Sequence, residues 1–185
     1  MNQVLETIAA RRSHRAYQPA QLTKEQLDAI LKAALEAPSA LNKQPWHYSV
    51  VQNQELLAQI HAAAKENAMK RDASQRSPRF NDEAFHIFYH APTVIILSAD
   101  PANDYAKIDC GIAVQTMALA AESLGLGSVI LGLPKEAFMT EGAPELRKKL
   151  CFPEGNDYVI AIALGTPADD KPAHDIGEDK ISMIL

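Results

Sequence analysis

The 185-residue sequence predicts an α+β fold in one domain, and three observations favour that class. Residues 93–98 form a continuous, largely β-branched run, which is typical of a strand buried on both faces. Residues 105–124 are apolar on nearly every side and predict the longest helix, with Gly125 placed to close it in a left-handed cap. Between Thr23 and Pro38, apolar side chains recur at helical spacing after a capping box. A buried strand among such helices indicates a central sheet that helices cover.

The remaining helices and strands are shorter and are predicted from the same two signals, helical spacing of apolar residues and runs typical of strands. Two segments show neither signal. Residues 70–90 begin with a charged, proline-broken stretch and are expected to form a flap, and residues 167–185 are expected to form an irregular polar arm with an apolar end. The other expected elements are helices at residues 2–10, 54–68 and 143–150, and strands at residues 47–51, 128–131 and 158–164.

Composition limits the classes of partner. The net charge of -5 and the pI near 5.7 argue against a general nucleic-acid binder, because basic residues are not in excess. No apolar run is long enough to span a bilayer and no leader with a cleavage site opens the chain, so we expect a cytoplasmic protein that binds neither nucleic acid nor membrane. Cys110 and Cys151 form no C-x-x-C pair and are expected to be reduced core thiols rather than a disulfide or a zinc site.

The most informative local feature is the cluster Arg11-Arg12-Ser13-His14-Arg15. A guanidinium group can grip phosphate oxygens through two parallel charge-assisted hydrogen bonds, and a serine hydroxyl adds a compact neutral donor. The cluster therefore predicts an anion site. Taken alone, however, such a run of basic residues is more often a solvated face that complements the C-terminal end of a helix.

A second segment, residues 37–47, favours the anion-site interpretation. It reads Ala-Pro-Ser-Ala-Leu-Asn-Lys-Gln-Pro-Trp-His and follows the cluster by one helix. Together the two segments resemble the FMN-dependent nitroreductase family, which has an R-x-S-x-R/K element near the N-terminus and a P-S-x-x-N-x-Q-P-W element about one helix later. Residues 119–128 are similar to the glycine-bounded end of that family's long central helix. The resemblance spans most of the chain.

The resemblance implies a nitroreductase-type fold, in which helices flank a mainly antiparallel central sheet. It also implies an intertwined homodimer with two FMN sites at the interface, and NADH or NADPH as the electron donor. The lack of a G-x-G-x-x-G turn for a pyrophosphate agrees with FMN rather than FAD. The small, apolar residues 38–40 and the apolar end of the arm, residues 181–185, agree with burial against a partner subunit.

In this chain the resemblance assigns the flavin phosphate to Arg11 and Ser13, and the N1 and C2-carbonyl edge of the flavin to Arg15. Arg12 is either a support for the ribityl chain or the phosphate, or a surface arginine. Lys171 is the candidate for the basic residue that returns to the phosphate, with His174 behind it. The chain departs from the family here, because many relatives carry a second basic residue close to that lysine. Lys171 and His174 therefore remain alternatives.

The second segment is also assigned to a flavin. Pro38, Ser39 and Ala40 would lie against the isoalloxazine ring of the other subunit's flavin, where small side chains matter more than chemistry. Asn42 and Gln44 offer amide donors and acceptors. Each would contact the flavin or tie down its own loop.

A third assignment concerns the strand that follows the long helix. The resemblance implies that the backbone of Ile130, Leu131 and Gly132 passes the central flavin ring, with the Leu131 amide donating to N5. Without the resemblance, these residues would be read as a plain strand end followed by a turn.

The flap supplies the candidates for substrate binding, Phe80, Phe85 and His90. The spacing of His86 and His90 would place both imidazoles on one face of a helix, as in some zinc sites. No H-E-x-x-H motif accompanies them, so no metal is expected, and a polar pair lining the flavin cavity or the surface is favoured. Asp109 lies in an apolar helix, needs a hydrogen-bond partner there, and is expected to be structural rather than catalytic.

The expected function is an NAD(P)H-dependent flavin oxidoreductase that reduces small electrophilic acceptors, such as nitroaromatics or quinones, by a ping-pong mechanism. No side-chain nucleophile or acid-base dyad accompanies the matched segments, so we expect no catalytic side chain and chemistry centred on the flavin. The alternative is a flavin-binding or flavin-processing protein of the same superfamily without nitroreductase turnover. A third possibility is a non-flavin anion-binding module that uses only residues 11–15.

Overall fold

The computed structural model describes residues 2–184, apart from the side chain of Glu178. The described residues form a four-stranded antiparallel sheet at the centre, with the strand order β1-β2-β4-β3. The predicted α+β class and its antiparallel central sheet are confirmed. The strands are β1 (His47–Val51), β2 (Thr93–Ala99), β3 (Gly127–Leu131) and β4 (Asp157–Gly165).

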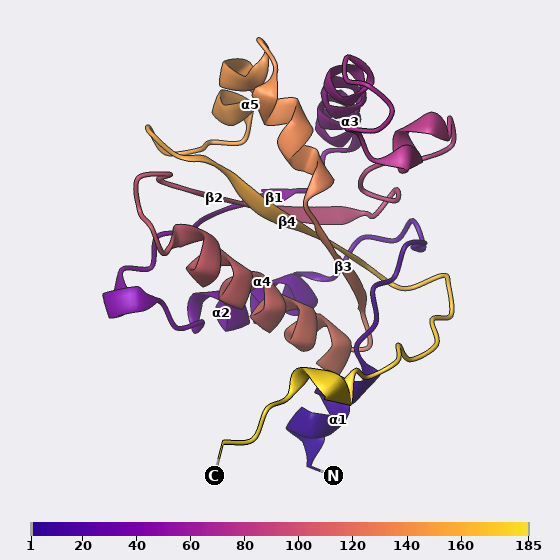
Figure 1. The fold of residues 1–185 in the computed structure, drawn as a ribbon, viewed down its shortest axis with the longest axis vertical. Coiled ribbons are helices and arrows are strands. Elements are labelled where there is room, and N and C mark those ends of the chain that lie inside the picture. Colours follow the sequence, from indigo (N-terminus) through magenta and orange to yellow (C-terminus); the bar gives the residue numbers. More distant parts are fainter. Residues whose placement is uncertain (1, 185) are drawn as a thin grey trace.

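Helices cover both faces of the sheet, which gives the molecule three layers (Figure 1). The first face carries the long central helix α4 (Ala106–Ser123) and α2 (Lys24–Leu35). The second face carries α3 (Gln54–Met69), η3 (Leu133–Met139) and α5 (Ala143–Lys149). The short N-terminal helix α1 (Gln3–Ala10) lies against the C-terminal half of α4.

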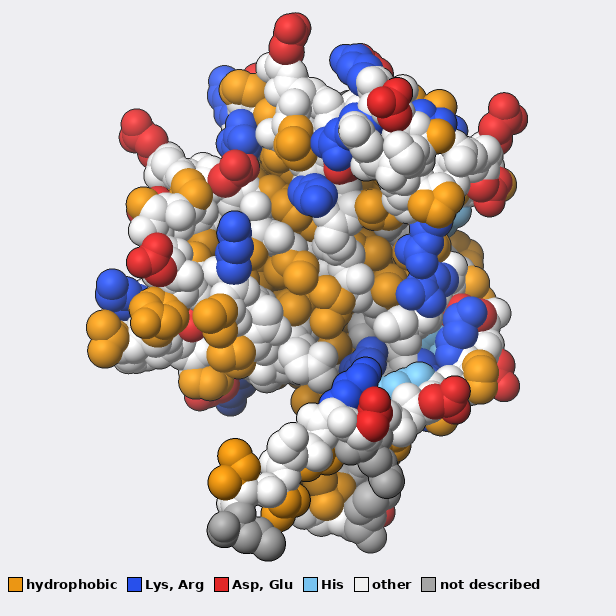
Figure 2. Space-filling view, viewed as in Figure 1, with side chains coloured by type: hydrophobic (Ala, Val, Ile, Leu, Met, Phe, Trp, Pro, Cys, Tyr) orange, Lys and Arg blue, Asp and Glu red, His pale blue; other side chains and the backbone are white. Residues whose placement is uncertain are grey.

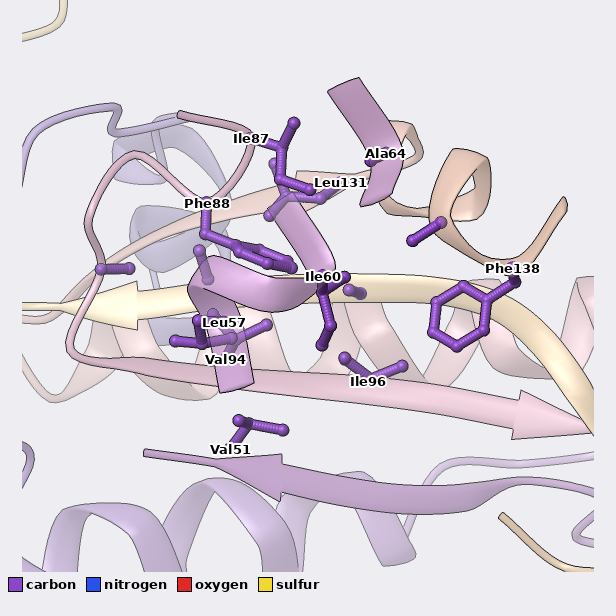
Figure 3. Close-up of a cluster of buried hydrophobic side chains, with 14 of the residues drawn as sticks. Val51, Leu57, Ile60, Ala64, Ile87, Phe88, Val94, Ile96, Leu131 and Phe138 are labelled. Atoms are coloured by element: carbon purple, nitrogen blue, oxygen red, sulfur yellow. The ribbon is translucent and has the colours of Figure 1, made fainter. Parts of the chain in front are cut away.

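The side chains of β2 point alternately to the two faces and so belong to both cores. Val94 and Ile96 pack in the cluster beneath α3 (Figure 3), whereas Ile95 and Leu97 pack in the cluster beneath α4. All residues of β2 are buried, as expected for a strand between two layers of helices. Burying one such side chain contributes about 1.5–3 kcal/mol, so β2 is the part of the sheet that most strongly fixes both layers.

Local sequence signals set the ends of the helices beside the site. The Gln26 N–H donates to Thr23 Oγ1 at 3.2 Å, and the Thr23 N–H donates back to the Gln26 side chain at 2.9 Å. This confirms the predicted capping box at the start of α2. Gly125 follows α4 with a φ of +72°, which confirms the predicted left-handed cap.

One alternative is excluded and one expectation needs correction. Residues 83–90 consist of turns and irregular backbone, and Tyr89 and His90 both adopt positive φ angles, 53° and 54°. His86 and His90 therefore do not share a helical face. Cys110 is buried as expected, but Cys151 is exposed, because it follows α5 on the surface instead of packing in the core. Both cysteines are free thiols.

The flap and the arm are the least regular parts of the chain. Residues 70–90 contain the short helix η2 (Pro78–Asn81), and Phe80 on it is only 2% exposed, so the core anchors the flap at this point. Residues 167–184 are irregular apart from η4 (Glu178–Lys180), and the predicted apolar end includes Leu185, which lies outside the described residues. Among the described residues, the longest helices are too short or too polar to cross a membrane.

Candidate functional site: a basic cavity between the sheet and the C-terminal arm

The basic cluster lies on an extended segment that the sheet holds on both sides. Ser13 forms a parallel bridge with Ser128 at the start of β3, and Tyr17 forms an antiparallel bridge with Pro167 just after β4. The His14 N–H donates to the Ser128 carbonyl at 3.0 Å. Residues 13–17 are therefore fixed as extended backbone beside the sheet, while Arg11 and Arg12 lie at the C-terminal end of α1.

Two glycines leave the space that this segment occupies. A Cβ atom at Gly127 would lie 3.1 Å from the His14 ring. At Gly165, it would lie 2.8 Å from Cδ of Pro92 and 3.0 Å from the Tyr17 ring. A Cβ atom at Gly165 would force its surroundings to shift, and one at Gly127 would require the His14 side chain to give way, so both glycines help the basic cluster to lie this close to the sheet.

The cluster and the first turn of the arm enclose a cavity of about 290 Å³. Figure 2 shows Lys, Arg and His side chains gathered where the arm leaves the body of the molecule. Residues predicted to bind the flavin phosphate thus come from both ends of the chain and line the same cavity. Lys171 and His174, the two alternatives in the arm, both line it. A small cavity with this lining suits a compact, multiply charged anion. The polar side chains of the lining are Arg11, Arg12, Ser13, Arg15, Lys171 and His174.

Several donors in this basic cavity have no protein partner. The Arg11 guanidinium and the Ser13 hydroxyl make no hydrogen bond or ion pair with another described residue. Arg12 differs, because its Nη1 donates to the carbonyls of Ala9 at 2.6 Å and Arg11 at 2.9 Å and so closes the end of α1. Its Nε is buried and has no partner among the described residues. Arg11 and Ser13 are free to bind a ligand, whereas Arg12 has only Nε and Nη2 to offer, because Nη1 is bonded to the backbone.

Asp169 connects the arm to the cluster. Its carboxylate accepts the Arg15 N–H at 3.0 Å, lies 3.2 Å from Nζ of Lys171, and lies 2.8 Å from Nδ1 of His14. Burial raises the pKa of Asp169, but the hydrogen bonds from Arg15, His14 and Lys171 outweigh it and lower the pKa to about 2. The ionised carboxylate therefore holds Lys171 at the edge of the basic cavity at neutral pH.

A second cavity of about 400 Å³ shares Arg15 with the first. Of the three residues predicted to bind substrate, Phe85 and His90 line it. Phe80 is 2% exposed and packs edge to face against Phe85, with ring centroids 5.7 Å apart. Phe80 thus supports the wall of this cavity from behind and does not face its interior.

Sequence reasoning assigned no role to three other residues of the second cavity, Tyr17, Asp82 and Tyr89. It had offered His86, with His90, as a polar pair lining the flavin cavity or the surface, and both histidines line this cavity. Arg15 lies over the Tyr89 ring, with its Cζ 5.9 Å from the centroid. Tyr17 is two residues from Arg15 on extended backbone, so the period of two could have identified it as a neighbour of the cluster. Asp82 and Tyr89 carry no comparable signal, because only the turns of the flap bring them to the cavity.

The second matched segment, residues 38–44, is tied down mostly by its own polar groups. The Gln44 N–H donates to Ser39 Oγ at 2.9 Å, and the Gln44 side chain donates to Asn42 Oδ1 at 3.0 Å. The Ala40 N–H donates to Oδ1 of Asp109, which is buried in the first turn of α4. Asn42 and Gln44 therefore hold the loop in shape. Nδ2 of Asn42 and Oε1 of Gln44 make no bond with another described residue, and Pro38 lies exposed beside them.

The two matched segments lie at opposite ends of α4 (Figure 1). Ala40 is held at Asp109, whereas Ser13 is held at Ser128, just after the helix ends. The part of α4 from Asp109 to its end at Ser123 is about 20 Å long at 1.5 Å per residue. Within one chain, the two segments border different spaces.

The third matched segment lies along β3. From Ser128 to Leu131 the strand extends about 10 Å, so Ile130, Leu131 and Gly132 lie at the far end of β3 from the basic cluster. Leu131 is buried and its carbonyl accepts the Tyr158 hydroxyl at 2.6 Å, while Gly132 is exposed. A ligand with its anionic end at Ser13 would have to extend along β3 to reach these residues.

These features define a class of protein: a three-layer α+β domain with a basic cavity between the sheet and the C-terminal arm. A family model described as the Nitroreductase family matches residues 8–166. The chain belongs to the Nitroreductase family, as the three sequence segments indicated.

Solved structures and a curated relative agree with this assignment. The chain is 36% identical to a nitroreductase with bound FMN from Desulfitobacterium hafniense, with a TM-score of 0.95 and 100% of each chain covered. A nitroreductase with bound FMN from Bacteroides fragilis is 32% identical, with a TM-score of 0.92 and again 100% of each chain covered. An Archaeoglobus fulgidus protein named "Putative NADH dehydrogenase/NAD(P)H nitroreductase" is 36% identical over 177 residues, which is 92% of this chain and 89% of the relative.

Proposed function

We propose that this protein is an FMN-dependent oxidoreductase that uses NADH or NADPH to reduce small electrophilic acceptors such as nitroaromatics or quinones. The observation that carries the proposal is the basic cavity, in which Arg11 and Ser13 have unpaired donors next to Lys171. The FMN-bound relatives, which share the fold over their full length, support the choice of ligand.

The residues of the basic cavity fit a terminal phosphate. Arg11 can offer two parallel N–H groups, Ser13 a hydroxyl, and Arg12 its buried Nε, which would otherwise remain without an acceptor. Lys171 adds a positive charge whose position Asp169 fixes. Of the two alternatives at the arm, Lys171 is favoured because it is anchored, whereas His174 is exposed and makes no hydrogen bond with another described residue.

With the phosphate at Ser13, the ribityl chain would run along β3 toward Leu131, and Arg15 would lie at the pyrimidine edge of the ring. Arg15 lines both cavities, which is the position this role requires. A positive charge about 4 Å from the developing negative charge contributes about 4 kcal/mol at an effective dielectric constant of 20, and less while Arg15 remains exposed to water. Arg15 is therefore the side chain that most favours the reduced state of the cofactor.

The proposal includes a homodimer in which residues 38–44 of one chain complete the flavin site of the other. The separation of the two matched segments along α4 supports this arrangement, because one ring would have to reach both ends of the helix if a single chain supplied them. Exposed apolar side chains on α1, on the outer face of α4 and on the arm support an extensive contact. They include Val4, Leu5, Ile8, Tyr105, Ile108, Ile181, Met183 and Ile184, which are 50% to 96% exposed.

When bound, FMN supplies the carrier for two electrons between the nicotinamide and the acceptor. The chain contributes binding, orientation and charge: Arg11 and Ser13 hold the phosphate, Arg15 stabilises the pyrimidine edge, and Phe85 and His90 shape the space for acceptors. Because one cavity borders Arg15 on the flap side, NAD(P)H and the acceptor would occupy it in turn, which gives ping-pong kinetics.

Anaerobic titration of the purified protein tests this function. We expect a flavin absorption spectrum that NADH or NADPH bleaches and that a quinone or nitroaromatic compound then restores. In steady-state kinetics, initial-rate plots at several fixed acceptor concentrations should give parallel lines. Intersecting lines would overturn the ping-pong mechanism. A bound flavin that undergoes no steady turnover with NAD(P)H and acceptor would instead support a flavin-processing protein.

A further inference from the structure

Three imidazole rings stack beside the second cavity. His61 comes from α3, whereas His86 and His90 come from the flap. The ring centroids of His61 and His86 are 4.3 Å apart and those of His86 and His90 are 4.5 Å apart, with the planes inclined by 31° and 30°. His86 thus lies between two other histidines, and the stack fixes the plane of its ring.

Backbone hydrogen bonds fix the tautomer of the two inner rings. Nδ1 of His61 accepts the Ile87 N–H at 3.4 Å, and Nδ1 of His86 accepts the Phe88 N–H at 3.3 Å. A ring that accepts a bond at Nδ1 carries its proton on Nε2 when it is neutral. This tautomer leaves His61 and His86 no lone pair for a metal ion and makes each Nε2 a donor.

The surroundings keep His86 neutral. Burial, followed by the neighbouring His61 and His90, lowers the pKa of His86 to about 4. The pKa of His61 is lowered as well, by burial, Lys65 and His90. Arg15, which shares the cavity, adds a positive charge. The other titratable groups of this cavity are Tyr17, Asp82 and Tyr89, and none of them forms an ion pair or hydrogen bond with His86 among the described residues.

The Nε2 donor of His86 has no hydrogen-bond partner in the part of the chain that the structure describes. His86 lines the second cavity, and its Nε2 makes no hydrogen bond with another described residue. A donor fixed in direction, uncharged and free to bind a ligand favours a ligand with an exposed oxygen acceptor.

Building on the proposed function, we propose that His86 is a specificity-determining residue whose neutral Nε2–H donates to a nitro or quinone oxygen of the acceptor, and that His61 is the residue that positions its ring. Such an oxygen gains negative charge as the acceptor takes up electrons, so the hydrogen bond strengthens during reduction. The inference extends the site beyond Phe85 and His90 and selects for acceptors that carry oxygen at the reducible group.

Replacement of His86 in the flavin-loaded protein tests this role. His86→Phe keeps a ring in the stack without the donor, and His86→Gln restores a neutral N–H. We expect His86→Phe to lower kcat/KM for benzoquinone and for nitrofurazone about tenfold, and His86→Gln to recover at least half of that loss on a logarithmic scale. Lys148→Ala, a replacement on the surface of α5 outside both cavities, should leave both values unchanged.

Ferricyanide, which takes electrons without an oxygen acceptor in the pocket, separates the possible failures. We expect all three variants to reduce ferricyanide at the wild-type rate. Unchanged quinone and nitrofurazone kinetics in His86→Phe would overturn the role of His86 while leaving the proposed function in place. Wild-type protein that oxidises NAD(P)H with none of the three acceptors would overturn both.

The pH dependence tests whether the donor is neutral and whether His61 positions it. Between pH 5.5 and pH 8, the ratio of kcat/KM for wild type and His86→Gln should stay constant; a tenfold rise of this ratio toward pH 5.5 would indicate a charged donor and overturn the inference. In ¹⁵N NMR of the histidine rings, His86 should show the Nε2–H tautomer in wild type. His61→Ala should raise the pKa of His86 toward its ordinary value, and an unchanged titration would remove His61 from the role.

Discussion

At the scale of single residues, the basic cavity is lined by side chains that make no hydrogen bond or ion pair with other described residues, and Arg11 is the clearest of them. Replacing Arg11 with alanine removes charge-assisted hydrogen bonds to the phosphate, each of which contributes about 1.5–3 kcal/mol. We therefore expect Arg11→Ala to weaken FMN binding by about 10- to 100-fold in fluorescence titrations, with little loss of thermal stability. Lys148→Ala, which removes an exposed cation on α5, is the matched control and should bind FMN as wild type does.

Asp169, unlike Arg11, contributes through hydrogen bonds and an ion pair to other residues of the protein. Its pKa of about 2 lies below the ordinary value of 3.8, so the carboxylate stabilises the folded protein above about pH 4 and loses that contribution as the pH falls toward 2. Asp169→Asn should reduce the free energy of unfolding by about 1–2 kcal/mol at pH 7, measured by urea denaturation. The difference from wild type should shrink as the pH falls toward 2 and vanish below it, and a difference that persists there would contradict an electrostatic origin.

Single residues also mark the limit of prediction from sequence. Arg11, Ser13 and Lys171 were assigned to one anion site and lie around one cavity. Asp169 was not foreseen, because its partners are as far as 155 positions away and no local pattern connects them. The stack of His61 and His86 was missed for the same reason, since one ring comes from α3 and the other from turns that have no sequence period.

At the scale of elements, the approach of the basic cluster to the sheet depends on the glycines at the ends of β3 and β4. Gly165→Ala would place Cβ 2.8 Å from Pro92, and Gly127→Ala would place it 3.1 Å from the His14 ring. We expect losses of about 1–3 kcal/mol in the free energy of unfolding, larger for Gly165→Ala, together with weaker FMN binding. At Gly142 a Cβ would be 3.8 Å from its nearest neighbour, so Gly142→Ala serves as the control. Wild-type flavin affinity in both strand variants would contradict the need for close approach.

Elements with strong local signals could be predicted, and those set by tertiary contacts could not. The capping box of α2, the β-branched run of β2 and the glycine after α4 each specify their own conformation, so their predicted bounds are close to those observed. Residues 83–90 contain histidines at helical spacing but consist of turns and irregular backbone. Their conformation follows from packing of Phe88 in the core and from left-handed Tyr89 and His90, neither of which a four-residue spacing reveals.

At the scale of the whole molecule, the exposed apolar surface predicts an obligate dimer. α1 has no buried residue although Val4, Leu5 and Ile8 lie on it, and Ile181, Met183 and Ile184 of the arm are more than 70% exposed. Truncation before Ile181 should therefore lower thermal stability and flavin content together, because it removes the apolar contact that this end of the arm would make with the partner subunit. Sedimentation velocity provides the check. A wild-type protein that is monomeric at low micromolar concentration and still retains its flavin would rule out the dimeric site.

The proposed flavin site depends on recognition of one terminal phosphate by the basic cavity, and a comparison of flavins tests this most directly. Calorimetric titration of flavin-free protein with FMN, riboflavin and FAD isolates the phosphate, because riboflavin lacks it and FAD buries it in a pyrophosphate. We expect FMN to bind at least about 100-fold more tightly than riboflavin, and Arg11→Ala to remove most of that difference. Equal affinities for FMN and riboflavin, or preferred binding of FAD, would contradict a phosphate site formed by Arg11, Ser13 and Lys171.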